Sequence, residues 1–157
     1  MTRIDHIDDP LAPPPNSLVP SAVVFVENDR AQVLLIQRSD NGDWALPGGG
    51  HDLGERIVDT AIREAKEETG LDVKVTGLIG TYTNPNHLVE YTSDGEVRQQ
   101  FALSFRAVVT GGTLTTSPES TKVEWFARSE LEALSINRGM RRRIDHGFEH
   151  RTEPYLE

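Results

Sequence analysis

The sequence predicts a layered domain of helices and strands, either an α+β fold or an α/β/α sandwich. Apolar, β-branched runs of strand length come first, one long amphipathic helix follows, and further strand-like runs precede two helical stretches. This order is typical of domains in which helices pack against a sheet. The chain has 157 residues, no internal repeat and no dividing linker, so we expect one domain.

The first twenty residues are rich in proline, which fixes φ and removes an amide donor. We therefore expect residues 1–20 to form an extended or partly disordered arm, with regular structure beginning at Ser21 and residues 21–157 forming the single domain. The arm lacks the basic start and apolar stretch of a secretory signal, and no apolar run is long enough to span a bilayer. We expect a cytoplasmic protein without a membrane partner.

The next elements are two strands and a glycine-rich loop. Residues 22–27 and 32–37 are apolar runs separated by Asn28-Asp29-Arg30, which predicts a β-hairpin. A polar loop over residues 39–43 leads towards Gly48-Gly49-Gly50. Three consecutive glycines indicate unusual φ values or a close approach of the main chain to another group.

The strongest helix prediction covers residues 55–69. Its apolar face has helical spacing, and Gly70 is well placed to end the helix in a left-handed conformation. The residues of that face are Val58, Ala61, Ile62 and Ala65.

The rest of the chain is predicted to add strands and then helices. Strands are expected at residues 72–82, 97–109 and 122–126, with a loop at 83–90 and a turn at Gly111-Gly112. Residues 129–134 have a serine N-cap and a glutamate at the capping-box position, which predicts a short helix. A second helix is expected at residues 137–150, with Met140, Ile144 and Phe148 on one face.

Composition excludes several classes of function. The absence of cysteine excludes disulfides, thiol nucleophiles and thiolate metal sites. A net charge of −9 argues against a broad basic surface that binds DNA or RNA. A polyphosphate substrate would need metal ions and a few well-placed arginines.

Three carboxylates project from one side of the predicted long helix. At about 100° per residue, Glu64, Glu67 and Glu68 span an arc of roughly 100°, centred about 120° from the apolar face. Like charges at these spacings destabilise a helix, which a bound cation such as Mg²⁺ would offset. Taken alone, the cluster is more simply interpreted as a solvated helical face, because glutamate favours helices.

The residues around this cluster resemble the Nudix (MutT-like) hydrolase family. Its signature, G-x5-E-x7-R-E-U-x-E-E-x-G-U, where U is a bulky aliphatic residue, is matched from Gly49 through Glu55 to Arg63–Leu71. The one departure is Ala65 at the first U position, which bears on packing more than on chemistry. The resemblance covers about residues 21–135, and the fixed polar and glycine positions at fixed spacing make it specific.

The resemblance implies an α/β/α sandwich with a mixed sheet and a strand-loop-helix catalytic motif. Glu64, Glu67 and Glu68 would bind Mg²⁺ or Mn²⁺ together with the carbonyl of Gly48. Arg63 would hold Glu55 in a structural ion pair. The implied reaction is metal-dependent hydrolysis of the diphosphate of a small nucleotide derivative.

The resemblance leaves the general base open between a glutamate of the signature and an acid from a later loop. Glu119 is the loop candidate, with an ordinary loop acid as the alternative interpretation; Glu90 and Glu96 are weaker candidates. Arg38 is a candidate for contact with substrate phosphate or, equally, for a surface ion pair.

We expect structural roles for several other polar and aromatic side chains. His87 is expected to be a loop residue, Tyr82 and Phe101 core residues, and Trp44 a support beneath the catalytic loop. The last helix carries a row of arginines, which favours a solvated face over a homodimer contact. These arginines are Arg138, Arg141, Arg142 and Arg143.

The substrate is weakly indicated. Pro85 lies fourteen residues after Leu71, close to where ADP-sugar-cleaving relatives carry a proline, which leans towards ADP-ribose-like compounds over nucleoside triphosphates. The competing class is a catalytically inactive nucleotide-sensing Nudix module. The intact set of glutamates favours the enzyme.

Overall fold

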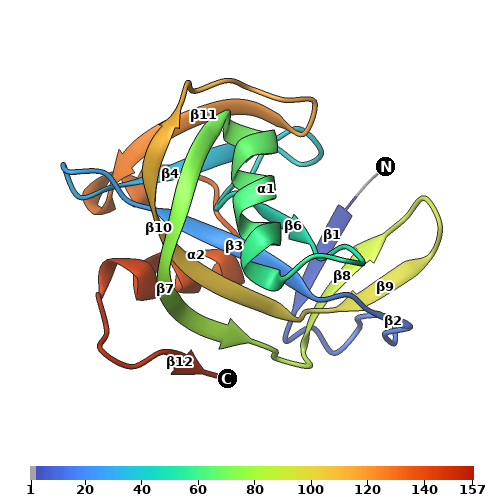
Figure 1. The fold of residues 1–157 in the computed structure, drawn as a ribbon. Coiled ribbons are helices and arrows are strands. Elements are labelled where there is room, and N and C mark those ends of the chain that lie inside the picture. The colour runs from blue at the N-terminus through green and yellow to red at the C-terminus, as the bar shows by residue number, and fades with distance from the viewer. Residues whose placement is uncertain (1–2) are drawn as a thin grey trace.

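The computed structural model describes residues 3–157 as a mixed α/β fold (Figure 1). The strands are β1 (Arg3–Ile7), β2 (Ser17–Leu18), β3 (Ser21–Val26), β4 (Gln32–Arg38), β5 (Trp44–Ala45), β6 (Gly48–Gly50), β7 (Leu71–Tyr82), β8 (His87–Tyr91), β9 (Glu96–Gln99), β10 (Ala102–Gly112), β11 (Ser120–Ala127) and β12 (Tyr155–Leu156). The helices are α1 (Ile57–Thr69), the 3-10 helix η1 (Arg128–Ala133) and α2 (Arg138–Phe148).

A five-stranded mixed sheet forms the centre of the molecule. Its order is β12-β7-β10-β3-β6, in which β10 pairs parallel with β3 and antiparallel with β7. Helix α1 lies over one face of this sheet and α2 over the other (Figure 1). The predicted α/β/α arrangement with a mixed sheet is therefore confirmed.

Strand β3 contributes to a hydrophobic core on each face of the sheet because successive side chains point to opposite sides. Val23 and Phe25 pack in the core that contains Met140 and Ile144 of α2. Alternate residues of the same strand pack in the core that contains α1. That second core includes Ala22, Val24, Val26, Ala61 and Ala65. The strand is apolar throughout because it is buried on both faces.

The predicted hairpin between residues 22–27 and 32–37 is wrong in its pairing, although both strands exist. Strand β3 pairs with β10 and β6, while β4 belongs to a separate three-stranded sheet of order β11-β4-β5. Within residues 3–157, the two strands are linked by the bridge between Glu27 and Val33 and by the amide of Asn28, which donates to the carbonyl oxygen of Gln32. Since β3 already has a neighbour on each edge, β4 has no edge of β3 with which to pair.

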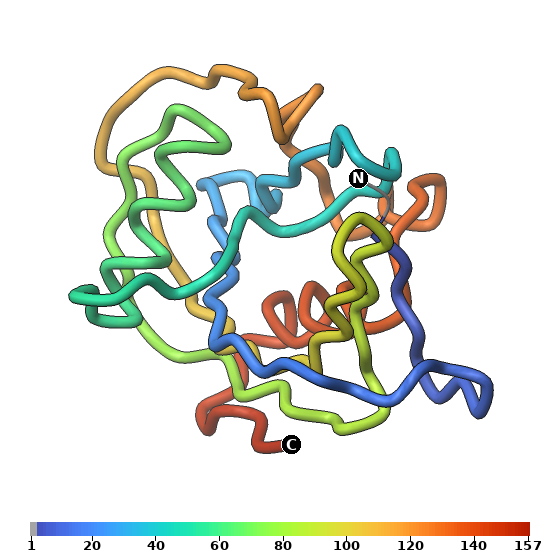
Figure 2. Tube along the Cα trace, turned by 90° about the vertical axis from the view of Figure 1, so that its right-hand side faces the viewer, coloured from blue at the N-terminus to red at the C-terminus, as the bar shows by residue number. Residues whose placement is uncertain are grey.

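Regular structure begins earlier than Ser21, contrary to the expectation for the proline-rich segment. Strand β1 pairs antiparallel with β8, and β2 pairs parallel with β9, in a four-stranded sheet of order β1-β8-β9-β2. Figure 2 shows this N-terminal segment running beside β8 and β9. The consecutive prolines, Pro13 to Pro15, lie between the two strands, where no strand requires their missing amide donors.

Other boundaries differ in detail. Residues 83–90 are not all loop, because β8 starts at His87, and the strand expected at 97–109 is divided into β9 and β10. Helix α1 starts at Ile57 and ends, as predicted, with Gly70 in a left-handed conformation. The short helix η1 is capped by Glu130, which accepts a hydrogen bond from the amide of Ala127, and not by Ser129.

The predicted apolar face of α1 is corrected at one residue. Ala61 and Ala65 are fully buried, but Val58 is exposed. The predicted face of α2 is confirmed, since Met140 and Ile144 are buried and Phe148 packs against them. Within residues 3–157, none of the helices combines the length and the apolar character needed to cross a membrane.

Two glycines in the left-handed conformation show how much of the destabilisation by an alanine substitution comes from packing and how much from backbone strain. We predict that Gly70→Ala destabilises the protein by about 2 kcal/mol or more, and that Gly42→Ala costs about 1 kcal/mol. Both residues have positive φ, 79° and 78°. A Cβ at Gly70 would lie 2.2 Å from the carbonyl oxygen of Thr113, whereas one at Gly42 meets nothing within 4 Å. Urea unfolding measures both, and equal losses would contradict this account.

Candidate active site

A cavity of about 430 Å³ opens between the glycine-rich strand β6, helix α1 and the start of α2. Glu64, Glu67 and Glu68 line it from α1, and the glycine run lines it beside them. Its other walls come from β4, β8, β9 and the N-terminal strand. The structure thus brings the glutamates of the sequence motif together at one hollow.

The three glutamates of α1 differ in their exposure. Glu64 is 8% exposed and Glu68 is 4% exposed, whereas Glu67 is exposed to solvent. The cluster is therefore not a solvated helical face. Helix α1 buries Ala61 and Ala65 in the core and also buries two carboxylates at the edge of the cavity.

The glycines of β6 let the main chain approach these carboxylates. The amide of Gly48 donates a hydrogen bond of 3.0 Å to Oε2 of Glu68. A Cβ at Gly49 would lie 2.4 Å from Oε1 of Glu64, and one at Gly48 would lie 2.3 Å from the carbonyl oxygen of Ala22. Two neighbouring positions thus require glycine for different close contacts, one with Glu64 and the other with β3.

Arg63 connects the loop before α1 to the glutamate cluster. Its guanidinium donates to both carboxylate oxygens of Glu55, at 2.5 and 3.1 Å, and to the carbonyl oxygen of Gly50 at 3.0 Å. It also donates to Glu64 at 2.8 Å and to Glu67 at 3.2 Å. The hydrogen bonds that Glu55 accepts from Arg63 lower the pKa of Glu55 to about 2. One side chain therefore fixes the loop, the glycine strand and two carboxylates relative to one another.

Burial raises the pKa values of the two inner carboxyls, Glu64 and Glu68. Loss of hydration raises the pKa of Glu68 to about 8, with the nearby charges of Glu64 and Glu119 adding to the effect. Loss of hydration also raises the pKa of Glu64, against the opposing effect of Arg63. For both carboxyls the loss of hydration outweighs the effect of the nearby positive charge. A cation in the cavity would add to that charge.

Glu119 is brought to the same cavity by the loop before β11. It is exposed, lines the cavity and acts electrostatically on both Glu64 and Glu68. The hydroxyl of Ser120 donates to the main-chain carbonyl of Glu68 at 2.7 Å, which ties this loop to α1. Glu119 is therefore a fourth carboxylate within the site, reached from a distant part of the sequence.

Arg38 lines the cavity but already has a partner. Its guanidinium forms a two-point contact with Asp40, at 3.0 and 2.6 Å. Asp40 is the largest factor that raises the pKa of Arg38, against its burial, and Glu68 adds to the effect. To contact substrate phosphate, Arg38 would have to divide its hydrogen bonds between Asp40 and the phosphate or release Asp40.

Several other sequence candidates lie outside the cavity. Glu90 accepts a hydrogen bond from His6, and Glu96 accepts two from Arg98. His87 is buried in β8 beside Asp5 and not in a loop. Tyr82 is buried, as expected, and its hydroxyl hydrogen-bonds to His146.

Trp44, Tyr91 and Phe101 are the aromatic residues among the described residues that line the cavity. Trp44 is buried, packs edge-on against Phe126 and lines the cavity, in agreement with its predicted supporting place. Phe101 also lines the cavity and is only partly buried.

Sequence reasoning missed the cationic side chains on the far wall of the cavity. Arg3, Arg98 and Arg143 line it from β1, β9 and α2. Arg3 was missed because the N-terminal segment was expected to be a partly disordered arm. The run of Leu88, Val89 and Tyr91 could have predicted a strand there. No sequence signal distinguished Arg143 from its arginine neighbours.

Within residues 3–157, no three His, Asp or Glu side chains already converge as a ready-made metal cage. Arg63 draws Glu64 and Glu67 towards itself and so competes with a metal for their oxygens. The donor set is nevertheless suited to a hard cation, since it consists of carboxylate oxygens beside the main chain of strand β6. The poorly compensated burial of Glu64 and Glu68 is the structural observation that fits a divalent ion here.

Comparisons with known proteins show the family to which this chain belongs. The model of the NUDIX domain matches residues 17–146. A MutT-like protein of Streptomyces ambofaciens is 41% identical over 120 residues, which cover 76% of this chain and 70% of that protein.

Two further relatives have more specific names. An ADP-ribose pyrophosphatase of Methanocaldococcus jannaschii is 35% identical over 116 residues, 72% of this chain and 64% of that protein. A putative 8-oxo-dGTP diphosphatase of Bacillus subtilis is 30% identical over 115 residues, 73% of this chain and 70% of that protein. The archaeal alignment thus spans slightly less than two thirds of its relative.

Solved structures resemble the fold as well. A NUDIX hydrolase from Nitrosomonas europaea superposes with a TM-score of 0.70 at 23% identity, over 90% of this chain and 78% of that one. At this level of identity the likeness concerns the fold alone.

Because the pKa of Glu68 is raised, we predict that replacing its carboxyl by an uncharged amide stabilises the folded protein to an extent that depends on pH. In an unfolded chain this carboxyl ionises near 4.5, but in the folded state it ionises only near 8. Stability therefore falls as pH rises from about 4.5 to 8 and stays low above 8. Without divalent ions, Glu68→Gln should be more stable than the wild type at pH 8.5, by on the order of 2 kcal/mol, with little difference at pH 4.

Urea unfolding at the two pH values measures this effect. The exposed Glu67→Gln is the matched control and should change little at either pH. Loss of stability in Glu68→Gln at pH 8.5 would contradict the assigned burial cost.

Proposed function

The chain belongs to the NUDIX hydrolase family and is a pyrophosphohydrolase of that family; from this premise we propose its metal dependence, site residues and substrate. The proposed reaction is divalent-metal-dependent hydrolysis of the phosphoanhydride bond of a nucleoside diphosphate-linked or nucleoside triphosphate substrate. The observation that carries it is the burial of Glu64 and Glu68 at a cavity wall, beside the close main chain of Gly48 and Gly49.

In this proposal the carboxylates of Glu64, Glu67 and Glu68 hold Mg²⁺ or Mn²⁺, with the carbonyl of Gly48 as a further ligand. Hard cations favour such oxygen donors. A bound ion would supply positive charge to phosphate oxygens and a coordinated water of lowered pKa. Its charge would also offset the desolvation that raises the pKa values of Glu64 and Glu68.

Arg63 acts as a positioning residue in this proposal. It holds Glu55 and Gly50 on one side and Glu64 on the other. Its two hydrogen bonds with Glu55 do not involve Glu64 and would hold the loop in place if a bound ion engaged that carboxylate. The pair of Glu55 and Arg63 is therefore assigned a structural role.

Two acids are suited to accept the proton of the attacking water. A glutamate of α1 can do so if it is not fully engaged by the ion, and Glu119 can do so from the opposite loop. Glu119 has the advantage of exposure, so that it can move towards the substrate, and no side chain of the described residues hydrogen-bonds to its carboxylate. We assign Glu119 as the leading candidate for the base.

The substrate class is a nucleotide derivative, and the named relatives support either ADP-ribose or an oxidised nucleoside triphosphate. Pro85 does not line the glutamate cavity; it lies on a separate hollow beside the N-terminal prolines. The lean towards ADP-ribose-like substrates therefore rests on the archaeal relative and not on contact between Pro85 and the substrate.

A nucleotide panel tests the proposed function. ADP-ribose, 8-oxo-dGTP and ordinary nucleoside triphosphates should be incubated with the protein in Mg²⁺, in Mn²⁺ and in a chelator. We predict cleavage of at least one compound with either metal and none in the chelator. Inertness towards the whole panel would favour a nucleotide-sensing module, and equal rates in the chelator would exclude the metal assignment.

Conservative substitution of the glutamates should lower activity without lowering the stability of the fold. We predict that Glu67→Gln and Glu68→Gln each lower kcat by about 100-fold or more, while melting temperatures stay near or above that of the wild type. Glu124→Gln, an exposed strand residue outside the cavity, should leave kcat unchanged. Near-normal turnover in both variants would be incompatible with their role as ligands.

The glycine run offers a matched pair of its own. A Cβ at Gly49 would collide with the carboxylate of Glu64, whereas one at Gly50 would meet only Val19 at 3.7 Å. We therefore predict a loss of about tenfold or more in kcat for Gly49→Ala and a much smaller change for Gly50→Ala. Similar activity in the two variants would show that the position of Glu64 does not limit the reaction.

A further inference from the structure

Arg143 lies at the junction of two hollows. Together with Gln100 it lines both the 430 Å³ cavity that contains the glutamates and a neighbouring groove of about 710 Å³. The groove extends along α2 and the start of β8, where His87 and Arg138 also line it. A substrate that extends from the glutamates along α2 would pass Arg143.

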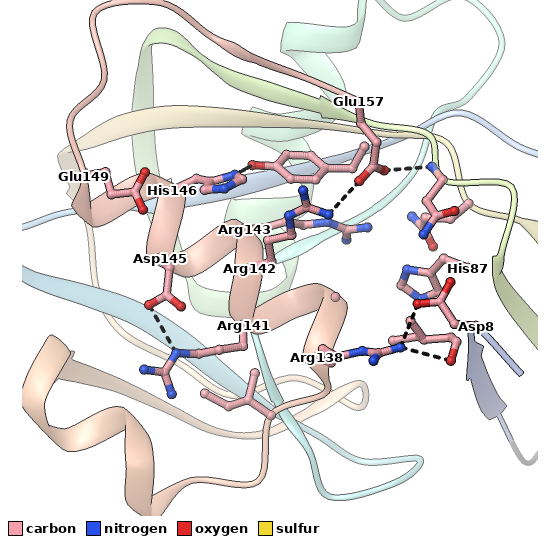
Figure 3. Close-up of a pocket in the computed structure, with 16 residues that line it drawn as sticks. Asp8, His87, Arg138, Arg141, Arg142, Arg143, Asp145, His146, Glu149 and Glu157 are labelled. Atoms are coloured by element: carbon pink, nitrogen blue, oxygen red, sulfur yellow. Dashed lines mark hydrogen bonds and ion pairs between the residues drawn. The ribbon is translucent and has the colours of Figure 1, made fainter.

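Arg143 differs from the other arginines of α2 in having no acidic partner. Figure 3 shows the row of arginines, three of which are joined to carboxylates by dashed lines. The partnered residues are Arg138 with Asp8 at 3.0 Å, Arg141 with Asp145 at 3.2 Å and Arg142 with Glu157 at 3.0 Å. Among residues 3–157, no group makes a hydrogen bond or ion pair with Arg143.

The same contrast holds around the glutamate cavity. Each of the other arginines that line it has a carboxylate within 3.1 Å. These pairs are Arg3 with Asp5, Arg38 with Asp40, Arg63 with Glu55 and Arg98 with Glu96. Arg143 is thus the one arginine of this cavity wall, within the described chain, whose charge is not neutralised by the protein.

Arg143 is also deeply buried. It is 4% exposed, and its Nε is closed off from solvent without a hydrogen-bond partner. Loss of hydration lowers its pKa to about 10, so the guanidinium stays charged at neutral pH. The guanidinium carbon lies 5.1 Å from the centre of the Tyr82 ring, a cation–π contact. A buried, unpaired guanidinium is costly, and a bidentate anion such as phosphate is its best complement.

We propose that Arg143 binds a phosphate group of the substrate other than the two joined by the bond that is cleaved, and so selects substrates that carry such a group. This assignment rests on the proposed pyrophosphohydrolase function. The additional phosphate can belong to a nucleoside triphosphate or to a phosphorylated sugar. Both present the same dianionic oxygens to the guanidinium.

Two substrate pairs test the selection and distinguish the sources. One pair is dGTP and dGDP; the other is ADP-ribose and its phosphate monoester on the terminal ribose. In the pair that the enzyme uses, Arg143→Gln should lower kcat/KM for the member with the additional phosphate about 10- to 100-fold, mainly through KM. The member without it should change by less than about threefold.

Arg141→Gln is the matched control, since Arg141 lies on the same helix and is neutralised by Asp145 and Glu132. It should alter neither member of a pair by more than about threefold. Arg143→Lys, which keeps the charge, should recover part of the selectivity. Equal losses for both members of a pair, or no loss in either, would overturn the proposal.

A binding measurement on the wild-type protein separates this proposal from the proposed function. In the metal-free protein, the Nε–H signal of Arg143 in a ¹⁵N NMR spectrum, identified by its absence in Arg143→Lys, is titrated with inorganic phosphate. A saturable shift supports the anion site even if no substrate of either pair is cleaved. No shift overturns the site even if the enzyme is active, and failure of the whole nucleotide panel concerns the proposed function alone.

Discussion

Glu64 and Glu68 are held where a carboxylate is poorly hydrated, and much of the surrounding structure follows from that constraint. Their helix must enter the core through Ala61 and Ala65 while it presents charge at the edge of a cavity. The main chain must come close enough for the amide of Gly48 to reach Glu68, and this approach excludes a side chain at Gly49. Arg63 is shared with Glu55, and Arg38, which also acts on Glu68, is paired with Asp40, so the carboxylates remain short of positive charge. A divalent ion would supply it.

The cavity is therefore electrostatically divided. At the end near α1, carboxylates accumulate and their pKa values rise. At the end near α2, Arg143 carries an unpaired positive charge in a buried setting. A polyphosphate compound complements both ends, because metal ions can mediate between its anionic oxygens and the glutamates while the guanidinium contacts its oxygens directly. This division also explains how a chain of net charge −9 can accommodate an anionic substrate.

The part of the fold that is encoded in local pattern was predictable, whereas pairing over long distances was not. The periodicity of residues 55–69, the glycine after the helix and the apolar run of residues 22–27 each led to an element that exists. The partner of β3 could not be deduced, because a strand buried on both faces carries no sign of which edge it pairs with. The proline-rich segment was wrongly expected to lack strands. Its composition indicates how free the backbone is, but not whether a distant strand such as β8 has an unpaired edge with which it can form hydrogen bonds.

The same distinction applies to the site. The helix glutamates were recognisable because their chemistry and spacing lie within one continuous segment. Arg143 was not, because its contrast with Arg138, Arg141 and Arg142 rests on contacts that these three make with Asp8, Glu132 and Glu157 in other parts of the fold. Anomalous diffraction from crystals grown with Mn²⁺ shows whether the buried carboxylates bind a divalent ion. We expect a manganese peak bonded to oxygens of Glu64 or Glu68; a map without a peak there, or with manganese only elsewhere, would exclude the proposed ion site.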